Sequence, residues 1–373
     1  MKMEKDTTLV SELQQDFFPI EDFDYMEFYV GNAKQAAYYM SRAFGFKIIA
    51  FAGLETGQRD RVSYVLEQRR IRFVVTGSLQ EDHPVTEFIK KHGEGAKDVA
   101  FRVDDVEKAY AEAISRGGIP VMAPQVLTDE HGTYKKAIIG TYGDTVHTLV
   151  DRKNYKGLFA PGYQPVNFSF PYQDAGLIGI DHVVGNVEQM DEWVSYYEKV
   201  MGFKEMIHYD DEDISTEYSA LMSKVICNGG RIKMPINEPA TGKRKSQIEE
   251  YLEFYNGPGV QHAALLTNDI ITTVKVLKES GVEFLDTPDT YYDELSDRVG
   301  KIDEDIEKLK QYRILVDRDE EGYLLQIFTK PLVDRPTLFF EIIQRKGATT
   351  FGEGNFKALF ESIEREQARR GNL

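Results

Sequence analysis

The sequence is poor in cysteine, in positive charge and in long apolar runs, and each shortage excludes a class of protein. The single cysteine, Cys227, excludes an internal disulfide and fits a reducing compartment. A net charge of −17 disfavours nucleic acids and anionic membranes as partners. No apolar run approaches the roughly 20 residues of a membrane span, and the polar N-terminal stretch lacks the apolar centre of a secretory signal. We therefore expect a cytoplasmic protein that binds neither nucleic acid nor a membrane.

What the chain does have is an internal repeat. Residues 23–49 match residues 178–207, and each segment reads as a strand, a Gly-Asn turn, a tyrosine-containing helix and a second strand. Residues 96–124 match residues 257–288, and each reads as a strand, an Asp at the turn, an amphipathic helix and a strand ending at proline. These repeats predict four strand–helix modules arranged in two halves.

The predicted fold class is α+β, with two duplicated domains of paired βαβββ modules. Each domain would form an open half-barrel sheet with its helices outside. The first domain would cover 20–152, the proline-containing segment 153–176 would be a linker, and the second domain would span 177–373. Apolar residues at helical spacing predict a C-terminal helix over 355–368 with Asn355 as its N-cap, and this helix would fold back over the opening of a site.

Three residues of the second half, His182, His262 and Glu341, form the candidate metal site. Each lies in a short apolar stretch that reads as a strand, and the steps between them are 80 and 79 residues. Two imidazoles and one carboxylate are the ligand set of non-haem Fe(II) oxygenases, which leaves coordination positions open for substrate and dioxygen. The same set also binds catalytic zinc, so the residue types alone leave the metal undecided.

The first half does not carry these ligands. Superposing the two repeats by sequence places Phe28 opposite His182, Asp98 opposite His262 and Thr148 opposite Glu341. We therefore expect one metal site per chain, located in the second half.

Amides and phenyl rings accompany the ligands along their strands. Gln261 precedes His262 and is expected to point away from the metal or toward a neighbouring layer, whereas Phe339 shares a strand face with Glu341. Gln326 and Phe328 share a face of another predicted strand. Such a pocket suits an aromatic substrate with a polar tail.

Three long stretches, at residues 232–265, 314–345 and 351–373, carry a resemblance that extends over essentially the whole chain. They resemble the 4-hydroxyphenylpyruvate dioxygenases of the vicinal-oxygen-chelate superfamily, whose fold is glyoxalase-like. The resemblance implies one Fe(II) per chain, held by His182, His262 and Glu341. It implies conversion of 4-hydroxyphenylpyruvate and O2 to homogentisate and CO2, a step of tyrosine and phenylalanine catabolism that combines oxidative decarboxylation, ring hydroxylation and side-chain migration. Because this substrate carries its own 2-oxo acid, no 2-oxoglutarate is needed.

The resemblance also assigns the surroundings of the metal. The polar side of the pocket would consist of Ser223, Asn237, Gln247, Gln261 and Gln326. The remaining substrate-pocket residues would be Pro235, Leu315, Phe328, Phe339, Phe351, Asn355, Phe356 and Leu359, with the C-terminal helix as a gate. A homo-oligomer, dimeric or tetrameric, is expected, with the ligand-free first half as the candidate for subunit contacts.

Three alternatives stay open at this point. A 4-hydroxymandelate synthase resembles the same family and uses the same substrate and ligands. The resemblance implies that the synthase has other residues at the positions of Pro235 and Phe356, whereas this chain retains both. A metal-free small-molecule binding protein of the same fold would lack the triad. A glyoxalase-type metal isomerase would work without oxygen.

Overall fold

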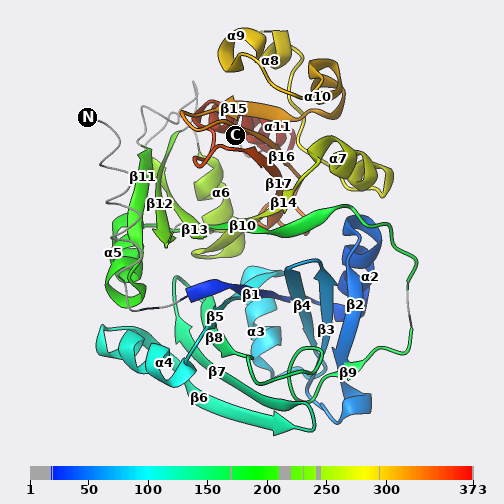
Figure 1. Cartoon of the computed structure of the whole chain (residues 1–373), viewed down its shortest axis with the longest axis vertical. Helices are drawn as coiled ribbons and strands as arrows, with labels where there is room; N and C mark the ends of the chain where they lie inside the picture. Colours follow the sequence, from blue (N-terminus) through cyan, green and yellow to red (C-terminus); the bar gives the residue numbers. More distant parts are fainter. Residues whose placement is uncertain are drawn as a thin grey trace.

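The molecule consists of two sheets stacked one above the other, each carrying helices (Figure 1). The computed structural model describes residues 18, 20–168, 170–209, 220–229, 231–240, 245–293 and 295–371. Within the described part, no helix is long and apolar enough to cross a membrane.

The first sheet has nine strands in the order β6-β7-β8-β5-β1-β4-β3-β2-β9. Its strands are β1 (Ile20–Tyr29), β2 (Lys47–Ala52), β3 (Arg61–Gln68), β4 (Ile71–Ser78), β5 (Gly95–Val103), β6 (Ile119–Asp129), β7 (Gly132–Gly140), β8 (Val146–Asp151) and β9 (Gln164–Pro165). Its helices are α2 (Ala33–Phe44), the short 3-10 helix η1 (Leu54–Thr56), α3 (Pro84–His92) and α4 (Val106–Ser115).

The second sheet has eight strands in the order β11-β12-β13-β10-β14-β17-β16-β15. Its strands are β10 (Leu177–Asn186), β11 (Lys204–Tyr209), β12 (Ala220–Asn228), β13 (Ile232–Ala240), β14 (Gly259–Thr267), β15 (Leu315–Arg318), β16 (Tyr323–Phe328) and β17 (Phe339–Lys346). Its helices are α5 (Met190–Met201), α6 (Gln247–Tyr255), α7 (Ile270–Glu279), α8 (Thr290–Asp293), α9 (Leu295–Val299), α10 (Ile306–Tyr312) and α11 (Glu353–Arg369).

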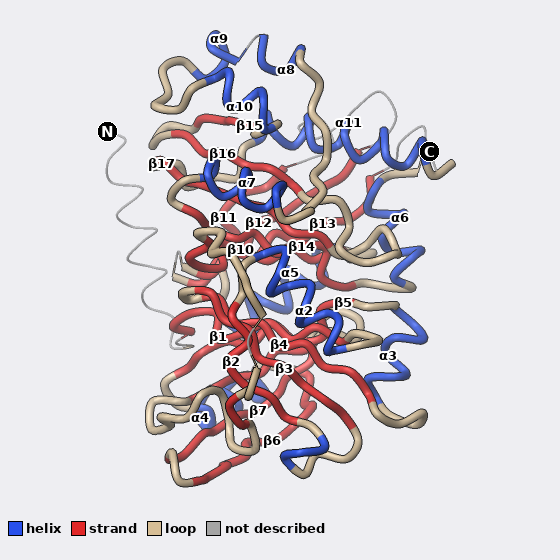
Figure 2. Tube along the Cα trace, turned by 90° about the vertical axis from the view of Figure 1, so that its right-hand side faces the viewer, coloured by secondary structure: helices blue, strands red, loops and turns tan. Residues whose placement is uncertain are grey.

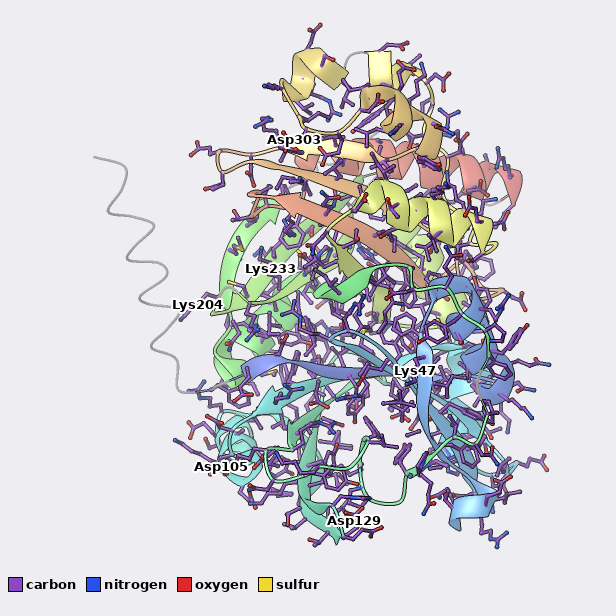
Figure 3. The ribbon with its side chains drawn as sticks, turned by 45° about the vertical axis from the view of Figure 1, so that its right-hand side comes forward. Lys47, Asp105, Asp129, Lys204, Lys233 and Asp303 are labelled. Carbon is purple, nitrogen blue, oxygen red and sulfur yellow. The ribbon has the colours of Figure 1, made fainter. Side chains whose placement is uncertain are left out.

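The repeated motifs fix where the helices begin and end. Asp105, labelled in Figure 3, caps α4 by accepting a hydrogen bond from the Lys108 amide, and Asp269 caps α7 in the same way. Helices α2 and α5 both stop at a glycine with positive φ, 78° at Gly45 and 65° at Gly202. These glycines are the centres of the repeated Phe-Gly-Phe and Met-Gly-Phe motifs.

The two halves share one apolar core, and Figure 2 shows the sheets packed against each other. The ring of Phe340 in β17 lies 6.2 Å from Phe28, 5.3 Å from Phe44 and 5.5 Å from Phe73, centroid to centroid. Its neighbour Glu341 points to the opposite face, as alternation along a strand requires. The face of the second sheet that carries the ligands therefore looks away from the first half.

The pairing registers of the two sheets are equivalent. Strands β1 and β5 pair with the same sequence of register shifts as β10 and β14, so that Tyr25 stands opposite Ala100 as His182 stands opposite Ala264. The strand that closes each set, β8 or β17, also pairs in the same register, so that Thr148 occupies the position of Glu341.

The prediction that Phe28 corresponds to His182 is wrong, because the register assigns that position to Tyr25. The error comes from the Gly-Asn pair used to superpose the repeats. In the first half, Asn32 lies after the strand and caps α2, whereas Asn186 is still inside β10 and pairs with Gly259. The equivalences of Asp98 with His262 and of Thr148 with Glu341 agree with the register.

In the first half, the three positions of the ligand set hold one another by hydrogen bonds. The Tyr25 hydroxyl donates to Asp98 Oδ2 over 3.0 Å, and Thr148 donates its backbone N–H to Oδ1 over 2.9 Å and its hydroxyl to Oδ2. Burial raises the pKa of Asp98 to about 7. The same scaffold thus holds a buried carboxyl group by three donated hydrogen bonds where the second half places metal-ligand types.

Two segments differ from the sequence-based expectations. Within 153–176, the predicted linker, residues Gln164–Pro165 form β9 and pair with β2 at the edge of the first sheet. The prediction of Asn355 as N-cap is wrong, because α11 begins at Glu353 after Gly352 and Asn355 lies in its first turn. The side chain of Asn355 is drawn instead into contacts with other elements.

His147, where the two halves meet, should make stability pH-dependent. Its Nδ1 contacts the Val99 carbonyl at 2.8 Å and its Nε2 contacts the Tyr197 hydroxyl of α5 at 2.6 Å. Burial lowers the pKa of His147 to about 4. Between about pH 6.5 and pH 4 the unfolded chain binds a proton that the folded chain does not. The free energy of unfolding is therefore expected to decrease by up to about 3 kcal/mol as the pH is lowered through this window.

Urea unfolding at a series of pH values measures this loss. The variant His147→Gln keeps a donor and an acceptor and should flatten the pH dependence in that window, whereas the same change at exposed His131 should not. Parallel curves for wild type and His147→Gln would contradict the assignment.

Candidate metal centre

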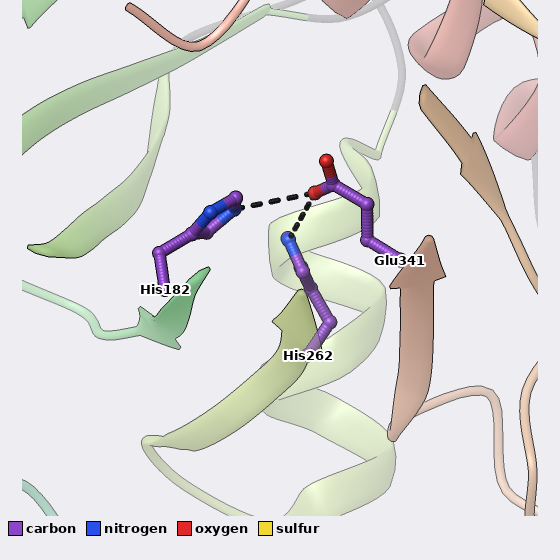
Figure 4. Close-up of side chains that lie close together, drawn as sticks. All are labelled: His182, His262 and Glu341. Carbon is purple, nitrogen blue, oxygen red and sulfur yellow. Dashed lines mark ion pairs between the residues drawn. The ribbon is translucent and has the colours of Figure 1, made fainter. Parts of the chain in front are cut away.

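His182, His262 and Glu341 come together on one face of the second sheet (Figure 4). They lie on the adjacent strands β10, β14 and β17, and their ligand atoms all lie within 4.8 Å of one another. Glu341 Oε2 is 3.2 Å from His182 Nε2 and 3.4 Å from His262 Nε2. The exposed fractions are 2%, 5% and 1%, so three potential ligands converge out of contact with bulk solvent.

The far nitrogen of each imidazole is held by an acceptor. His182 Nδ1 lies 2.8 Å from Asp181 Oδ1, and His262 Nδ1 lies 2.9 Å from Gln261 Oε1. Because both partners are oxygens, each Nδ1 is the donor, and each Nε2 is the nitrogen that faces Glu341 Oε2, where it can hold a proton or coordinate a metal ion. Gln261 therefore orients a ligand, a role that strand alternation alone did not indicate.

Behind Asp181 lies a half-buried arginine that ties this arrangement to the loop before α11. Arg345 donates Nη2–H to Asp181 Oδ1 over 2.7 Å and Nε–H to Oδ2 over 2.8 Å. It also donates to the carbonyls of Ala348 and Thr350. The ring of Phe351, which follows, lies 4.8 Å from that of His182.

The protonation tendencies of the cluster suit a cation. Burial would raise the pKa of Glu341, but the charge and hydrogen bond of His182 and the hydrogen bond of His262 lower it to about 2. Burial lowers the pKa of His262. At His182 burial is outweighed by Glu341 and Asp181, which raise its pKa. An ionised carboxylate beside two imidazoles is the donor set of a catalytic metal site, and a metal ion would compete with the proton at His182 Nε2.

A narrow pocket surrounds the triad. Its free volume is about 30 Å³, far below the 300–1,000 Å³ typical of small-molecule sites. Its lining consists of the triad and Val184, Ser223, Pro235, Asn237, Gln247, Gln261, Gln326, Phe328, Phe351, Leu359 and Phe360. Leu359 and Phe360 belong to α11, so this helix closes the pocket in the present conformation.

All five residues predicted for the polar side line this pocket, and so do Pro235, Phe328, Phe351 and Leu359. Three other predicted positions, Phe339, Leu315 and Asn355, contact residues of this lining. Phe339 stacks on His262 with ring centroids 4.7 Å apart and lines the adjoining small cavity. Leu315 packs with Phe328 and Leu359. Asn355 contacts Gln326, and the side chain of Phe356 lies outside the described residues.

Two lining residues, Val184 and Phe360, were not anticipated. Val184 follows His182 by two positions on β10, so the strand period could have identified it. Phe360 lies in the apolar stripe of the predicted C-terminal helix, next to Leu359. Both signals were present in the sequence.

Comparisons with known proteins agree with this geometry. Residues 16–163 match the family model described as "Hydroxyphenylpyruvate dioxygenase, HPPD, N-terminal", and residues 179–327 match that of the Glyoxalase/Bleomycin resistance protein/Dioxygenase superfamily. The 4-hydroxyphenylpyruvate dioxygenase of Yarrowia lipolytica is 48% identical, with 94% of this chain and 93% of that protein covered. The chain belongs to the 4-hydroxyphenylpyruvate dioxygenase family. The enzyme of that name from Caenorhabditis elegans is 47% identical, over 98% of this chain and 97% of that protein.

A solved structure supports both the fold and the family. A mutant of 4-hydroxymandelate synthase from Streptomyces coelicolor superposes with a TM-score of 0.80 at 34% identity, covering 94% of this chain and 99% of that chain. The predicted glyoxalase-like fold class is confirmed, and the triad is a site that could hold a metal ion in a chain of this family.

Proposed function

We propose that this chain is a non-haem Fe(II) dioxygenase that converts 4-hydroxyphenylpyruvate and O2 to homogentisate and CO2. The observation that carries the proposal is the buried His182–His262–Glu341 cluster, in a chain 48% identical to an enzyme named for this substrate. Fe(II) held by these three residues would supply a Lewis-acid anchor for the 2-oxo acid and the redox chemistry that activates dioxygen.

The chain's own contribution is to orient the ligands before a metal binds. Asp181 and Gln261 accept hydrogen bonds from Nδ1 of the two histidines, so that Nε2 is the nitrogen of each ring that can coordinate a metal ion. Gln326 donates to Glu341 Oε1 over 2.8 Å, which leaves Oε2 facing the histidines. Such preorganisation avoids reorientation of the ligands during binding.

The pocket residues would position the substrate and exclude water. Phe328 and the ring of Phe339 flank His262 and suit an aromatic ring, while Asn237, Gln247 and Ser223 offer amides and a hydroxyl for polar groups. Because only about 30 Å³ is free, substrate entry requires movement of α11 or of the loop before it. Closure behind the substrate would keep water from the reacting groups.

A second candidate is 4-hydroxymandelate synthase activity, because the superposed solved structure is a mutant of such an enzyme. The matched synthase mutant is 34% identical, whereas the relatives named 4-hydroxyphenylpyruvate dioxygenase are 46–48% identical over nearly the whole chain. This difference and the retained Pro235 in the pocket wall support the dioxygenase. Measuring turnover with Fe(II), with Zn(II) and without oxygen also tests the zinc alternative and the glyoxalase-type reaction.

The test is oxygen uptake with 4-hydroxyphenylpyruvate by the protein reconstituted with Fe(II), with chromatographic identification of the product. We expect stoichiometric consumption of O2 and formation of homogentisate, and we expect no turnover after reconstitution with Zn(II). Hydroxymandelate as the product would favour the synthase, whereas turnover without oxygen would overturn the dioxygenase proposal.

Assembly and location remain proposals as well. The edge strand β6 exposes Ile119, Val121 and Val126 by 43%, 53% and 58%, which supports subunit contacts through the first half in a dimer or tetramer. The single, buried Cys227 supports a cytoplasmic location.

A further inference from the structure

A chain of side-chain hydrogen bonds leads from the carboxylate of Glu341 to helix α8. Gln326 donates Nε2–H to Glu341 Oε1 over 2.8 Å. Asn355 donates Nδ2–H to Gln326 Oε1 over 2.8 Å, and the Tyr291 hydroxyl donates to Asn355 Oδ1 over 2.7 Å. The four groups come from β17, β16, α11 and α8, four elements that are separated in sequence.

The carboxylate sets the direction of the whole chain. Gln326 presents its amide nitrogen to Glu341 Oε1 and therefore its amide oxygen to Asn355. The Asn355 amide then turns its own oxygen toward Tyr291, which has to donate. Gln326, Asn355 and Glu341 are 1–2% exposed, so water cannot replace a missing donor cheaply.

The single proton of the Tyr291 hydroxyl has two acceptors within reach, and Asn355 Oδ1 at 2.7 Å is the nearer. The hydroxyl accepts from the Val316 amide over 2.8 Å. The other acceptor, the Val316 carbonyl at 2.9 Å, also accepts from Arg298 over 3.0 Å, and Arg298 stacks on the Tyr291 ring at 4.7 Å. Burial raises the pKa of Tyr291 to about 12, so the hydroxyl keeps its proton at neutral pH.

The position of Asn355 links this series of hydrogen bonds to the closure of the pocket. Asn355 lies in the first turn of α11, the helix that supplies Leu359 and Phe360 to the pocket wall. The same turn is anchored by the Gly354 amide, which donates to Asp317 Oδ2 over 2.7 Å. Displacing this turn to admit a substrate would break the hydrogen bonds of Asn355 and leave Gln326 Oε1 without its donor.

We propose that Tyr291 is a positioning residue that couples closure of α11 to the orientation of the Glu341 carboxylate through Asn355 and Gln326. The inference rests on the proposed role of Glu341 as a metal ligand. Tyr291 itself touches neither the ligands nor the pocket. With α11 closed, Oε1 is held and Oε2 is presented to the metal position, and with α11 open the carboxylate is free to rotate.

The variant Tyr291→Phe removes only the hydroxyl group. In the metal-free full-length chain we expect hydrogen–deuterium exchange in the first turns of α11 to rise about tenfold, because a buried amide oxygen loses its donor. On titration with Co(II), used as a spectroscopic probe, we expect weaker binding by about threefold or more and an altered visible spectrum, because the carboxylate is less well oriented.

The matched control is Tyr292→Phe, the same chemical change at the next residue. The Tyr292 ring is buried, but its hydroxyl contacts none of the residues of this chain of hydrogen bonds. This variant should resemble wild type in both readouts. The variant Asn355→Asp should resemble Tyr291→Phe, because a carboxylate cannot donate to Gln326 Oε1.

Two results would overturn the proposal. Unchanged exchange in α11 for Tyr291→Phe would show that the hydroxyl does not anchor the helix. Increased exchange with an unchanged Co(II) spectrum would show an anchor without coupling to the carboxylate. Failure of the proposed function looks different, because wild type itself would then bind no Co(II) at the triad while the exchange difference in the metal-free chain could still be measured.

Discussion

Replacing His182 with alanine is expected to abolish turnover of 4-hydroxyphenylpyruvate while the chain stays folded. The imidazole supplies one of three potential ligands, and its Nε2 lies 3.2 Å from Glu341 Oε2. Loss of a residue that merely orients a ligand costs about 10–100-fold in metal affinity or activity. Loss of the ligand itself should therefore cost more than about 100-fold.

The measurement pairs oxygen uptake with the iron content of the purified protein. His131→Ala is the matched control, because His131 is exposed and lies in the first half. Thermal unfolding checks that His182→Ala keeps its fold, since removing one imidazole from the polar pocket leaves the core between the sheets intact. Near-full activity of His182→Ala would show that the triad is not the metal site.

Much of the site could be predicted because its residues repeat at equivalent strand positions. The steps of 80 and 79 residues between the ligands reflect three adjacent strands, β10, β14 and β17, of one duplicated scaffold. The fold class followed from the same repeats. The polar residues of the pocket came from the family resemblance, and the structure places them around the triad.

The predictions that were wrong depended on where a strand or a helix begins or ends. The Gly-Asn pairs were equivalent as letters, but one lies in a turn and the other in a strand, so Phe28 was chosen instead of Tyr25. Asn355 has the chemistry of an N-cap, yet hydrogen bonds to Gln326 and Tyr291 hold its side chain. A local pattern cannot reveal such partners, because Tyr291 is 64 residues away in sequence.

A second large effect is expected at Asp181, whose carboxylate lies behind His182 with 10% of its side chain exposed. Asp181 accepts from His182 Nδ1 and receives two hydrogen bonds from Arg345. Burial would raise the pKa of Asp181, but these partners hold it well below its usual range, so it is ionised at neutral pH. Asp181→Asn should weaken Fe(II) binding by about 10–100-fold, because the imidazole loses the negative charge that makes it a better donor to the metal.

The same substitution should destabilise the fold. Removing one partner of a buried ion pair costs about 3–5 kcal/mol. We expect the lower end, near 3 kcal/mol, because Arg345 keeps hydrogen bonds to the carbonyls of Ala348 and Thr350. Urea unfolding of the metal-free chain measures this loss separately from Fe(II) titration. Asp191→Asn is the control, since Asp191 is 82% exposed and its pair with Lys224 lies at the surface.

The two measurements separate support of the fold from support of the metal. In Asp181→Asn the oxygen of the new side-chain amide can still accept from His182 Nδ1, so the tautomer persists and only the charge is lost. An amide nitrogen turned toward Arg345 would meet another donor, which explains why stability falls even though the shape is kept. If Asp181→Asn lost stability but bound Fe(II) like wild type, the pair with Arg345 would be structural alone, and the orientation of His182 would have to come from β10 itself.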